Sequence, residues 1–138
     1  MATKGDNSEV ERCLRTLLET DGFELTPCRT HGETGVDIIA KKGVKSLHIE
    51  VIGYKARGPA CAKDFFEAFF RAISRINDGA KTCIIAQPTA AEKGLPKRAR
   101  QYGEAWRRIG ETFPELQIWL IDTENYTYKA SEWNDWLR

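Results

Sequence analysis

An amphipathic helix is predicted near the start of the chain, because apolar residues recur there at spacings of three and four. Ser8 followed by Glu11 matches a capping box at its beginning, and Gly22 is a typical end signal. The helix is therefore predicted from about Glu9 to Thr20, after a flexible leader over residues 1–7. Its apolar positions are Val10, Leu14, Leu17 and Leu18.

Three short strands are predicted next. Phe23 to Cys28 is the first, and Val36 to Lys41 and Ser46 to Ile52 follow it. The last two segments alternate apolar and polar residues, as strands with one buried face do. Lys42-Gly43 lies between them and is predicted to form a two-residue hairpin turn.

Helices and buried strands alternate along the rest of the chain. The order α-β-β-β-α-β-α-β predicts an α/β fold, in which a mixed sheet lies between layers of helices in a three-layer sandwich. A single domain is expected over residues 8–138. The predicted helices are Asp64 to Ile76, one that opens at Gly94-Leu95-Pro96, and a short one that carries Trp133, Trp136 and Leu137; the predicted strands are Lys81 to Ala86 and Leu116 to Asp122.

The second predicted helix is more apolar than one buried face requires. Its main stripe includes Phe65, Phe69 and Ile73, whereas Phe66 and Phe70 lie beside that stripe. These two rings either pack against the next helix or form a homodimer surface. The pattern favours core packing, with the homodimer as the alternative.

The hairpin places acidic side chains on one face. If Leu47, Ile49 and Val51 point to the core, Glu50 points the other way, and the same alternation turns Asp37 away from the core. With Lys42-Gly43 as the turn, Asp37 is predicted opposite His48 and diagonal to Glu50. Converging carboxylates repel each other unless a cation lies between them, and hard oxygen ligands suit Mg²⁺ or Mn²⁺. The alternative is a solvated polar face without a metal.

Overall charge and composition exclude several classes of protein. The 138 residues carry 21 Lys and Arg against 20 Asp and Glu, a net charge of +1, so any nucleic-acid surface must come from local clustering. No apolar run is long enough to cross a membrane, and a cytoplasmic protein is expected. The scattered cysteines do not supply a zinc site and are predicted to be buried, reduced thiols; they are Cys13, Cys28, Cys61 and Cys83.

The acidic residues and the order of elements resemble the PD-(D/E)XK nuclease superfamily. Glu11 in the first helix, Gly35-Val36-Asp37, and Glu50 in an apolar strand before a helix match its pattern. The likeness is in particular to Mrr-type restriction endonucleases and Holliday-junction resolvase-like enzymes, and it spans about residues 8–122. The resemblance implies a restriction-endonuclease-like fold and metal-dependent hydrolysis of DNA phosphodiester bonds.

Carried onto this sequence, the resemblance assigns roles to four residues. Asp37, Glu50 and the backbone carbonyl of Val51 would hold Mg²⁺ or Mn²⁺. Glu11 would contact a metal-bound water or hold a neighbouring residue in place.

The lysine of the family pattern is missing. Its position, two residues after Glu50, is occupied by Ile52. Lys55 is the predicted substitute, because a bulge at Gly53 could re-aim its side chain. A solvated surface lysine is the alternative for Lys55.

Basic residues near these elements are candidates for phosphate contacts, which would make DNA binding sensitive to salt but not to sequence. An ordinary charged helix face is the alternative. If no cation replaces the lysine, the second functional hypothesis is a catalytically inactive nuclease-fold module that binds DNA or a protein partner. A partner protein that supplies DNA specificity is a further option. The candidate DNA-binding residues are Arg57, Lys63, Lys97, Arg98 and Arg100.

Overall fold

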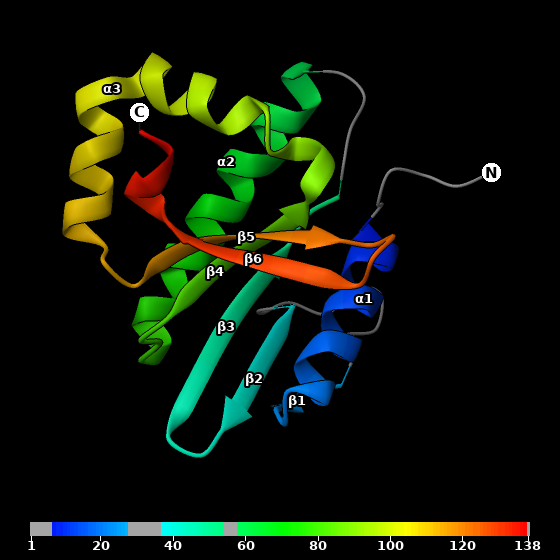
Figure 1. The fold of residues 1–138 in the computed structure, drawn as a ribbon. Helices are drawn as coiled ribbons and strands as arrows, with labels where there is room; N and C mark the ends of the chain where they lie inside the picture. The colour runs from blue at the N-terminus through cyan, green and yellow to red at the C-terminus, as the bar shows by residue number, and fades with distance from the viewer. Residues whose placement is uncertain (1–6, 28–36, 54–57, 138) are drawn as a thin grey trace.

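A six-stranded mixed sheet forms the centre of the fold (Figure 1). The computed structural model describes residues 7–27, 37–53 and 58–137 of the chain. The strands follow one another across the sheet in chain order. They are β1 (Glu24–Leu25), β2 (Ile38–Lys42), β3 (Lys45–Val51), β4 (Cys83–Pro88), β5 (Leu116–Asp122) and β6 (Thr127–Glu132).

The central strands β3, β4 and β5 are parallel, and the flanking strands pair antiparallel. This arrangement confirms the predicted α/β class with a mixed sheet. The edge strand β6 was not predicted, because the segment TYKASE is largely exposed and lacks an apolar alternation. Tyr128 of this strand stacks on Trp119 of β5 with ring centroids 4.7 Å apart, which anchors the edge.

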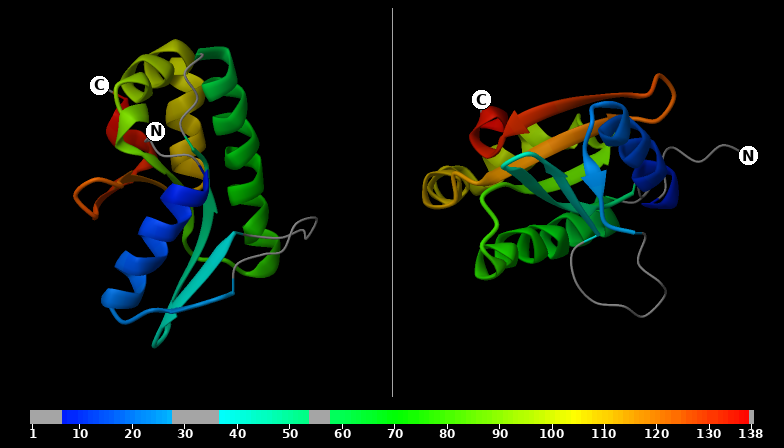
Figure 2. Two further views of the ribbon diagram at one scale, coloured as in Figure 1. Left: turned by 90° about the vertical axis from the view of Figure 1, so that its right-hand side faces the viewer. Right: turned by 90° about the horizontal axis from the view of Figure 1, so that it is seen from below.

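Helices cover both faces of the sheet (Figure 2). α1 packs on one face, whereas α2 and α3 pack on the other. Short 3₁₀ turns connect or follow these elements. The helices are α1 (Asn7–Thr20), α2 (Gly58–Ser74) and α3 (Gly94–Thr112), and the 3₁₀ turns are η1 (Arg75–Asp78), η2 (Thr89–Ala91) and η3 (Trp133–Trp136).

Strand alternation divides the core into two clusters. On the α1 face, apolar residues of α1 meet one set of strand residues, and the other set meets α2 and α3. All six residues of β4 are buried, as a parallel strand covered on both faces requires. The α1-side cluster includes Val10, Leu14, Leu18, Ile38, Ala40, Leu47, Ile49, Val51, Ile84 and Ala86.

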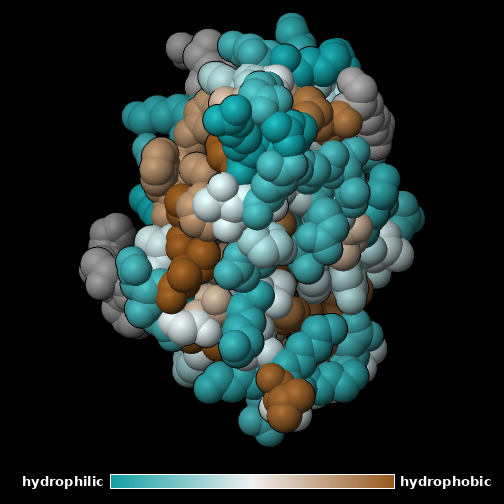
Figure 3. Space-filling model, turned by 90° about the vertical axis from the view of Figure 1, so that its left-hand side faces the viewer, coloured by the Kyte–Doolittle hydropathy of each residue, from teal (hydrophilic) through white to brown (hydrophobic). Residues whose placement is uncertain are grey.

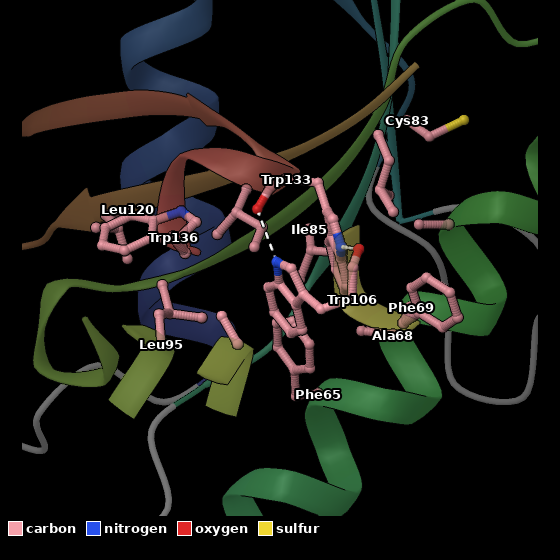
Figure 4. Close-up of a cluster of buried hydrophobic side chains, with 14 of the residues drawn as sticks. Phe65, Ala68, Phe69, Cys83, Ile85, Leu95, Trp106, Leu120, Trp133 and Trp136 are labelled. Carbon is pink, nitrogen blue, oxygen red and sulfur yellow. Dashed lines mark hydrogen bonds between the residues drawn. The ribbon is translucent and has the colours of Figure 1, made fainter. Parts of the chain in front are cut away.

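Two tryptophans attach the end of the chain to α3 (Figure 4). The indole N–H of Trp106 donates to the carbonyl of Trp133 at 3.1 Å, and the indole N–H of Trp133 donates to the carbonyl of Trp106 at 2.9 Å. Their rings stack with centroids 3.9 Å apart. Both indole donors are therefore satisfied inside an apolar core, which removes the cost of burying them.

Close approach between α3 and η3 depends on a glycine. A Cβ atom at Gly110 would lie 2.4 Å from the amide nitrogen of Asn134, whose side chain donates to the carbonyl of Arg107. A larger residue at this position would displace the Asn134 side chain and disturb its hydrogen bond to Arg107.

A bend divides α3 at Gly103, which has φ 47° and ψ −112°. L-residues rarely adopt a positive φ, so glycine is the residue suited to this position. The first half of α3 consequently crosses the end of the sheet where β4 ends, and the second half turns away from it (Figure 1). The sequence pattern indicates the helix but not the bend.

The predicted capping box at the start of α1 is wrong. The helix begins at Asn7, so Ser8 lies inside its first turn. The Glu11 carboxylate instead forms an ion pair with Arg15, one turn further along the helix. The predicted leader falls largely on residues 1–6, outside the described part of the chain.

α2 begins six residues before the predicted start at Asp64. Gly58-Pro59 opens the helix. Proline suits the first turn of a helix, because its missing N–H has no helical partner there. The predicted C-terminal helix is the 3₁₀ turn η3.

The two phenylalanines beside the main stripe of α2 behave differently. Phe66 packs edge-on against Tyr102 of α3, with ring centroids 5.6 Å apart, as core packing predicted. Phe70 is 67% exposed.

On the face shown in Figure 3, apolar surface lies in a strip and smaller clusters among polar side chains. No helix in the described residues is long and apolar enough to span a bilayer.

Candidate functional site

The hairpin register places Asp37 closer to Glu50 than the sequence analysis predicted. Lys42 pairs with Lys45 and Ile39 with His48, so the turn residues are Gly43 and Val44. Gly43 has φ 61° at the first central position, where a type II′ turn takes glycine. The predicted pairing of Asp37 with His48 is therefore wrong. Because the shift is two residues, each side chain keeps its face.

Asp37 lies directly before β2, at the point where the β2–β3 ladder ends. Its Oδ2 accepts a hydrogen bond from the backbone N–H of Val51 at 2.8 Å. Continuing the register from the pair Ile38–Ile49 brings Asp37 level with Glu50. The N–H and C=O of one residue in an antiparallel strand point to the same side, so the Val51 carbonyl also points toward the Asp37 side.

Glu50 is a buried acid in the middle of the sheet, with 3% of its surface exposed. It pairs in register with Ile85 of β4, and it points to the face covered by α2. Acidic side chains are rarely buried to this extent, since a desolvated charge needs compensation. Glu50, Asp37 and Val51 thus bring carboxylate and carbonyl oxygens to the carboxyl end of β3.

Arg15 connects Glu11 to the same region. Its Nε donates to Glu11 Oε2 at 2.8 Å, its Nη1 to the carbonyl of Thr26 at 2.5 Å, and its Nη2 to the carbonyl of Asp37 at 3.3 Å. Within the described residues, no three acidic, histidine or cysteine side chains gather as a metal cluster. Glu11 therefore meets Asp37 through Arg15. Sequence reasoning missed Arg15, although its spacing of four from Glu11 is a helical ion-pair signal.

The position of the missing lysine is part of the core. Ile52 is half-buried and packs against the cluster on the α2 face, the face to which Glu50 also points. An isoleucine there contributes packing and no hydrogen-bond donor. The predicted substitute Lys55 and the candidate Arg57 lie outside the described residues.

A further polar side chain lies next to Ile52 and was not predicted. Gln87 of β4 is 3% exposed, and the N–H of Ile52 donates to the carbonyl of Ala86 at 2.9 Å, which sets Ile52 beside Gln87. The available signal was an amide near the end of the otherwise apolar strand CIIAQP.

The basic candidates on the described helices differ in how exposed their side chains are. Lys63, Lys97 and Arg100 are exposed. Arg98 is half-buried, and its guanidinium lies 4.9 Å from the centre of the Phe65 ring, so its stem is held by the core. The first half of α3 carries three of these residues across the end of β4 (Figure 1).

His48 and Cys83 lie away from Asp37 toward the other end of the sheet. They pair in register between β3 and β4. Burial lowers the pKa of His48 and raises the pKa of the Cys83 thiol to about 11. Cys13 and Cys83 are both buried and free, as predicted for reduced thiols. Cys28 lies outside the described residues, as does the side chain of Cys61.

The amino-acid sequence matches a nuclease family. The family model Mrr_cat, described as a restriction endonuclease, matches residues 3–124. The chain belongs to this restriction endonuclease family. The match includes Glu11, Asp37, Glu50 and Ile52, and it confirms the resemblance drawn from the sequence. Among curated proteins, none matches the sequence.

Two solved structures have a fold similar to that of this chain. An XisH family protein from Nostoc punctiforme is 20% identical, with a TM-score of 0.60, and the match covers 90% of this chain and 98% of that one. An fdxN element excision controlling factor protein from Anabaena variabilis is 17% identical, with a TM-score of 0.57 and coverage of 88% and 96%. At these identities the likeness concerns the fold.

Proposed function

We propose that the protein is a divalent-metal-dependent endonuclease that hydrolyses DNA phosphodiester bonds. The observation that carries this proposal is the position of the Asp37 carboxylate, bonded to the Val51 N–H and level with the buried Glu50. Membership of a restriction endonuclease family supports the same activity.

The ligand set at this position fits Mg²⁺ or Mn²⁺. Two carboxylates and one backbone carbonyl are hard oxygen donors, which these cations prefer over nitrogen or sulfur. Asp37 and Glu50 would hold the ion together with the Val51 carbonyl. When bound, the ion would lower the pKa of a water molecule and neutralise charge on the phosphate.

The protein's own groups fix the geometry of this site. The Val51 N–H holds the Asp37 carboxylate in one orientation, and Arg15 holds the Asp37 backbone through its bond to that carbonyl. Glu11 orients Arg15 by the ion pair at 2.8 Å. Glu11 is therefore proposed as a positioning residue rather than a direct ligand.

DNA is the proposed substrate, with Mg²⁺ or Mn²⁺ as the cofactor. Lys97 and Arg100 on the first half of α3, and Lys63 on α2, are exposed cations suited to phosphate oxygens. Lys55 remains proposed as the cation that replaces the family lysine. Arg57 and Arg98 complete the proposed contact set.

The second candidate function is a module of the same fold that binds DNA or a protein without cutting. Ile52, packed into the core at the lysine position, favours this alternative. The exposed Phe70 is its best candidate for a contact with a partner or a second copy.

Cleavage of plasmid and branched DNA with Mg²⁺ or Mn²⁺ tests the two functions. Asp37→Asn, Glu50→Gln and Lys55→Met are compared with the parent, and Glu124→Gln, which changes an exposed acid on the β5–β6 turn, is the matched control. The nuclease predicts metal-dependent cutting that the three site variants lose and the control keeps. Cutting by Asp37→Asn at the parent's rate would contradict the site. Salt-sensitive DNA binding without cutting by the parent would favour the binding module.

A further inference from the structure

Gln87 carries a buried amide that no other described residue satisfies. It is 3% exposed, and its Nε2 has no hydrogen-bond partner among the residues that the structure describes. A buried donor that is left unpaired costs folding free energy, so native proteins seldom retain one without a reason. Isosteric apolar side chains would fill the same space at the end of β4 without that cost.

The parallel register of β3 and β4 places this amide beside the proposed site. Glu50 pairs with Ile85, and Val51 pairs with Ala86. The bond from the Ile52 N–H to the Ala86 carbonyl continues this register, so Ile52 lies beside Gln87 at the ordinary strand spacing of about 4.8 Å. By alternation along each strand, Glu50, Ile52 and Gln87 point to the same face.

Gln87 offers the hydrogen-bond donor that Ile52 lacks. The Nε2 group has two N–H donors, whereas the isoleucine side chain has none. Phosphate oxygens accept such bonds, and an amide can fix their orientation although it adds no positive charge. Glu50 and Gln87 are both 3% exposed, and they point to the same face from neighbouring strands, with Glu50 paired to Ile85 two residues before Gln87.

We propose that Gln87 is a further catalytic residue, whose Nε2 donates a hydrogen bond to a non-bridging oxygen of the scissile phosphate. This proposal rests on the proposed nuclease function. It places the missing donor on the neighbouring strand at the position beside Ile52. In the protein without DNA, the unpaired Gln87 Nε2 is then a preorganised hydrogen-bond donor for the phosphate.

Gln87→Met and Gln87→Glu separate this role from a structural one. The methionine keeps the length of the side chain and removes both polar atoms, and the glutamate keeps an acceptor and removes the donors. Gln101→Met, on the exposed face of α3, is the matched control. The measurements are single-turnover DNA cleavage with Mn²⁺, Mn²⁺ binding by calorimetry, and thermal unfolding.

A catalytic donor predicts a combination that a structural residue does not produce. Cleavage by Gln87→Met is expected to slow by about 10²–10³-fold, while Mn²⁺ binding is kept and the Tm is equal or higher because the unpaired donor is gone. Gln87→Glu is expected to cleave as slowly, and Gln101→Met at the parent's rate.

The failure of this proposal differs from the failure of the nuclease. If the parent and Gln87→Met cleave equally fast, Gln87 has no catalytic role and the nuclease stands. If Gln87→Met loses stability and Mn²⁺ binding along with activity, Gln87 is structural. If the parent does not cleave, the nuclease is refuted and the catalytic role of Gln87 with it.

Discussion

Replacing Asp37 tests the central contact of the proposed site through stability alone, before any activity is assumed. In the folded protein, Asp37 Oδ2 accepts the Val51 N–H at 2.8 Å, where the β2–β3 ladder ends. Asp37→Ala leaves this N–H without its acceptor, in a strand whose Val51 is 5% exposed. A hydrogen bond to a charged acceptor contributes about 1.5–3 kcal/mol, so a loss of that size is expected.

Asp37→Asn separates the hydrogen bond from the charge. Its side-chain oxygen still accepts the Val51 N–H, but a neutral bond is roughly half as strong as a charged one, so about 1 kcal/mol should be lost. For a chain of this length, each kcal/mol shifts the Tm by roughly 3–5 °C. Urea unfolding and thermal scans in EDTA measure both variants, and Glu124→Ala, an exposed control, is expected within about 0.5 kcal/mol of the parent.

Adding Mn²⁺ to the same samples tests the ligand role. A ligand at 100 times its Kd stabilises the folded state by about 2.7 kcal/mol. This gain is expected for the parent and for Glu124→Ala, and it should be absent in both Asp37 variants. Both variants remove the Asp37 charge and its repulsion from Glu50, so the Asp37–Val51 contact is refuted if Asp37→Ala is as stable as Asp37→Asn in EDTA. If Asp37→Asn keeps the Mn²⁺ gain, the metal role is refuted.

Three other predictions concern the surrounding fold. Arg15→Met should cost about 2 kcal/mol in urea unfolding, because two backbone carbonyls lose their donor; no loss would show that these bonds contribute nothing. Phe65→Ala should cost about 3–5 kcal/mol because the ring is 1% exposed, whereas Phe70→Ala, at 67% exposed, should cost far less; equal losses would contradict the packing. Burial lowers the pKa of His48, so stability should fall as the pH drops below the ordinary value of about 6.5, since the unfolded chain binds the proton more readily. His48→Asn should reduce that fall in urea titrations at pH 7.5 and 5.5, and an unchanged pH dependence would rule out His48 as its source.

Local pattern was sufficient for the order of the elements as far as β5. The α/β class, the strand Leu116–Asp122 and the helix that opens at Gly94 follow from hydrophobic spacing and glycine or proline signals. Errors occurred where tertiary packing decides the outcome. β6 forms because β5 offers it a pairing edge, and α3 bends at Gly103, although each segment's own pattern indicates neither.

In the candidate site, too, some features follow from the local sequence pattern and others depend on tertiary packing. Alternation along the two strands of the hairpin is a period of two, so Asp37 and Glu50 share a face in the predicted register and in the observed one, which differ by two residues. The sequence by itself therefore determined which acids belong together and which family they resemble. Only the tertiary structure decided the partners of those acids. Arg15 reaches the Asp37 carbonyl from α1, and Gln87 comes beside Ile52 from β4. Both contacts join segments far apart in the chain, so their geometry depends on how the helix and the strands pack rather than on the periodicity of either segment.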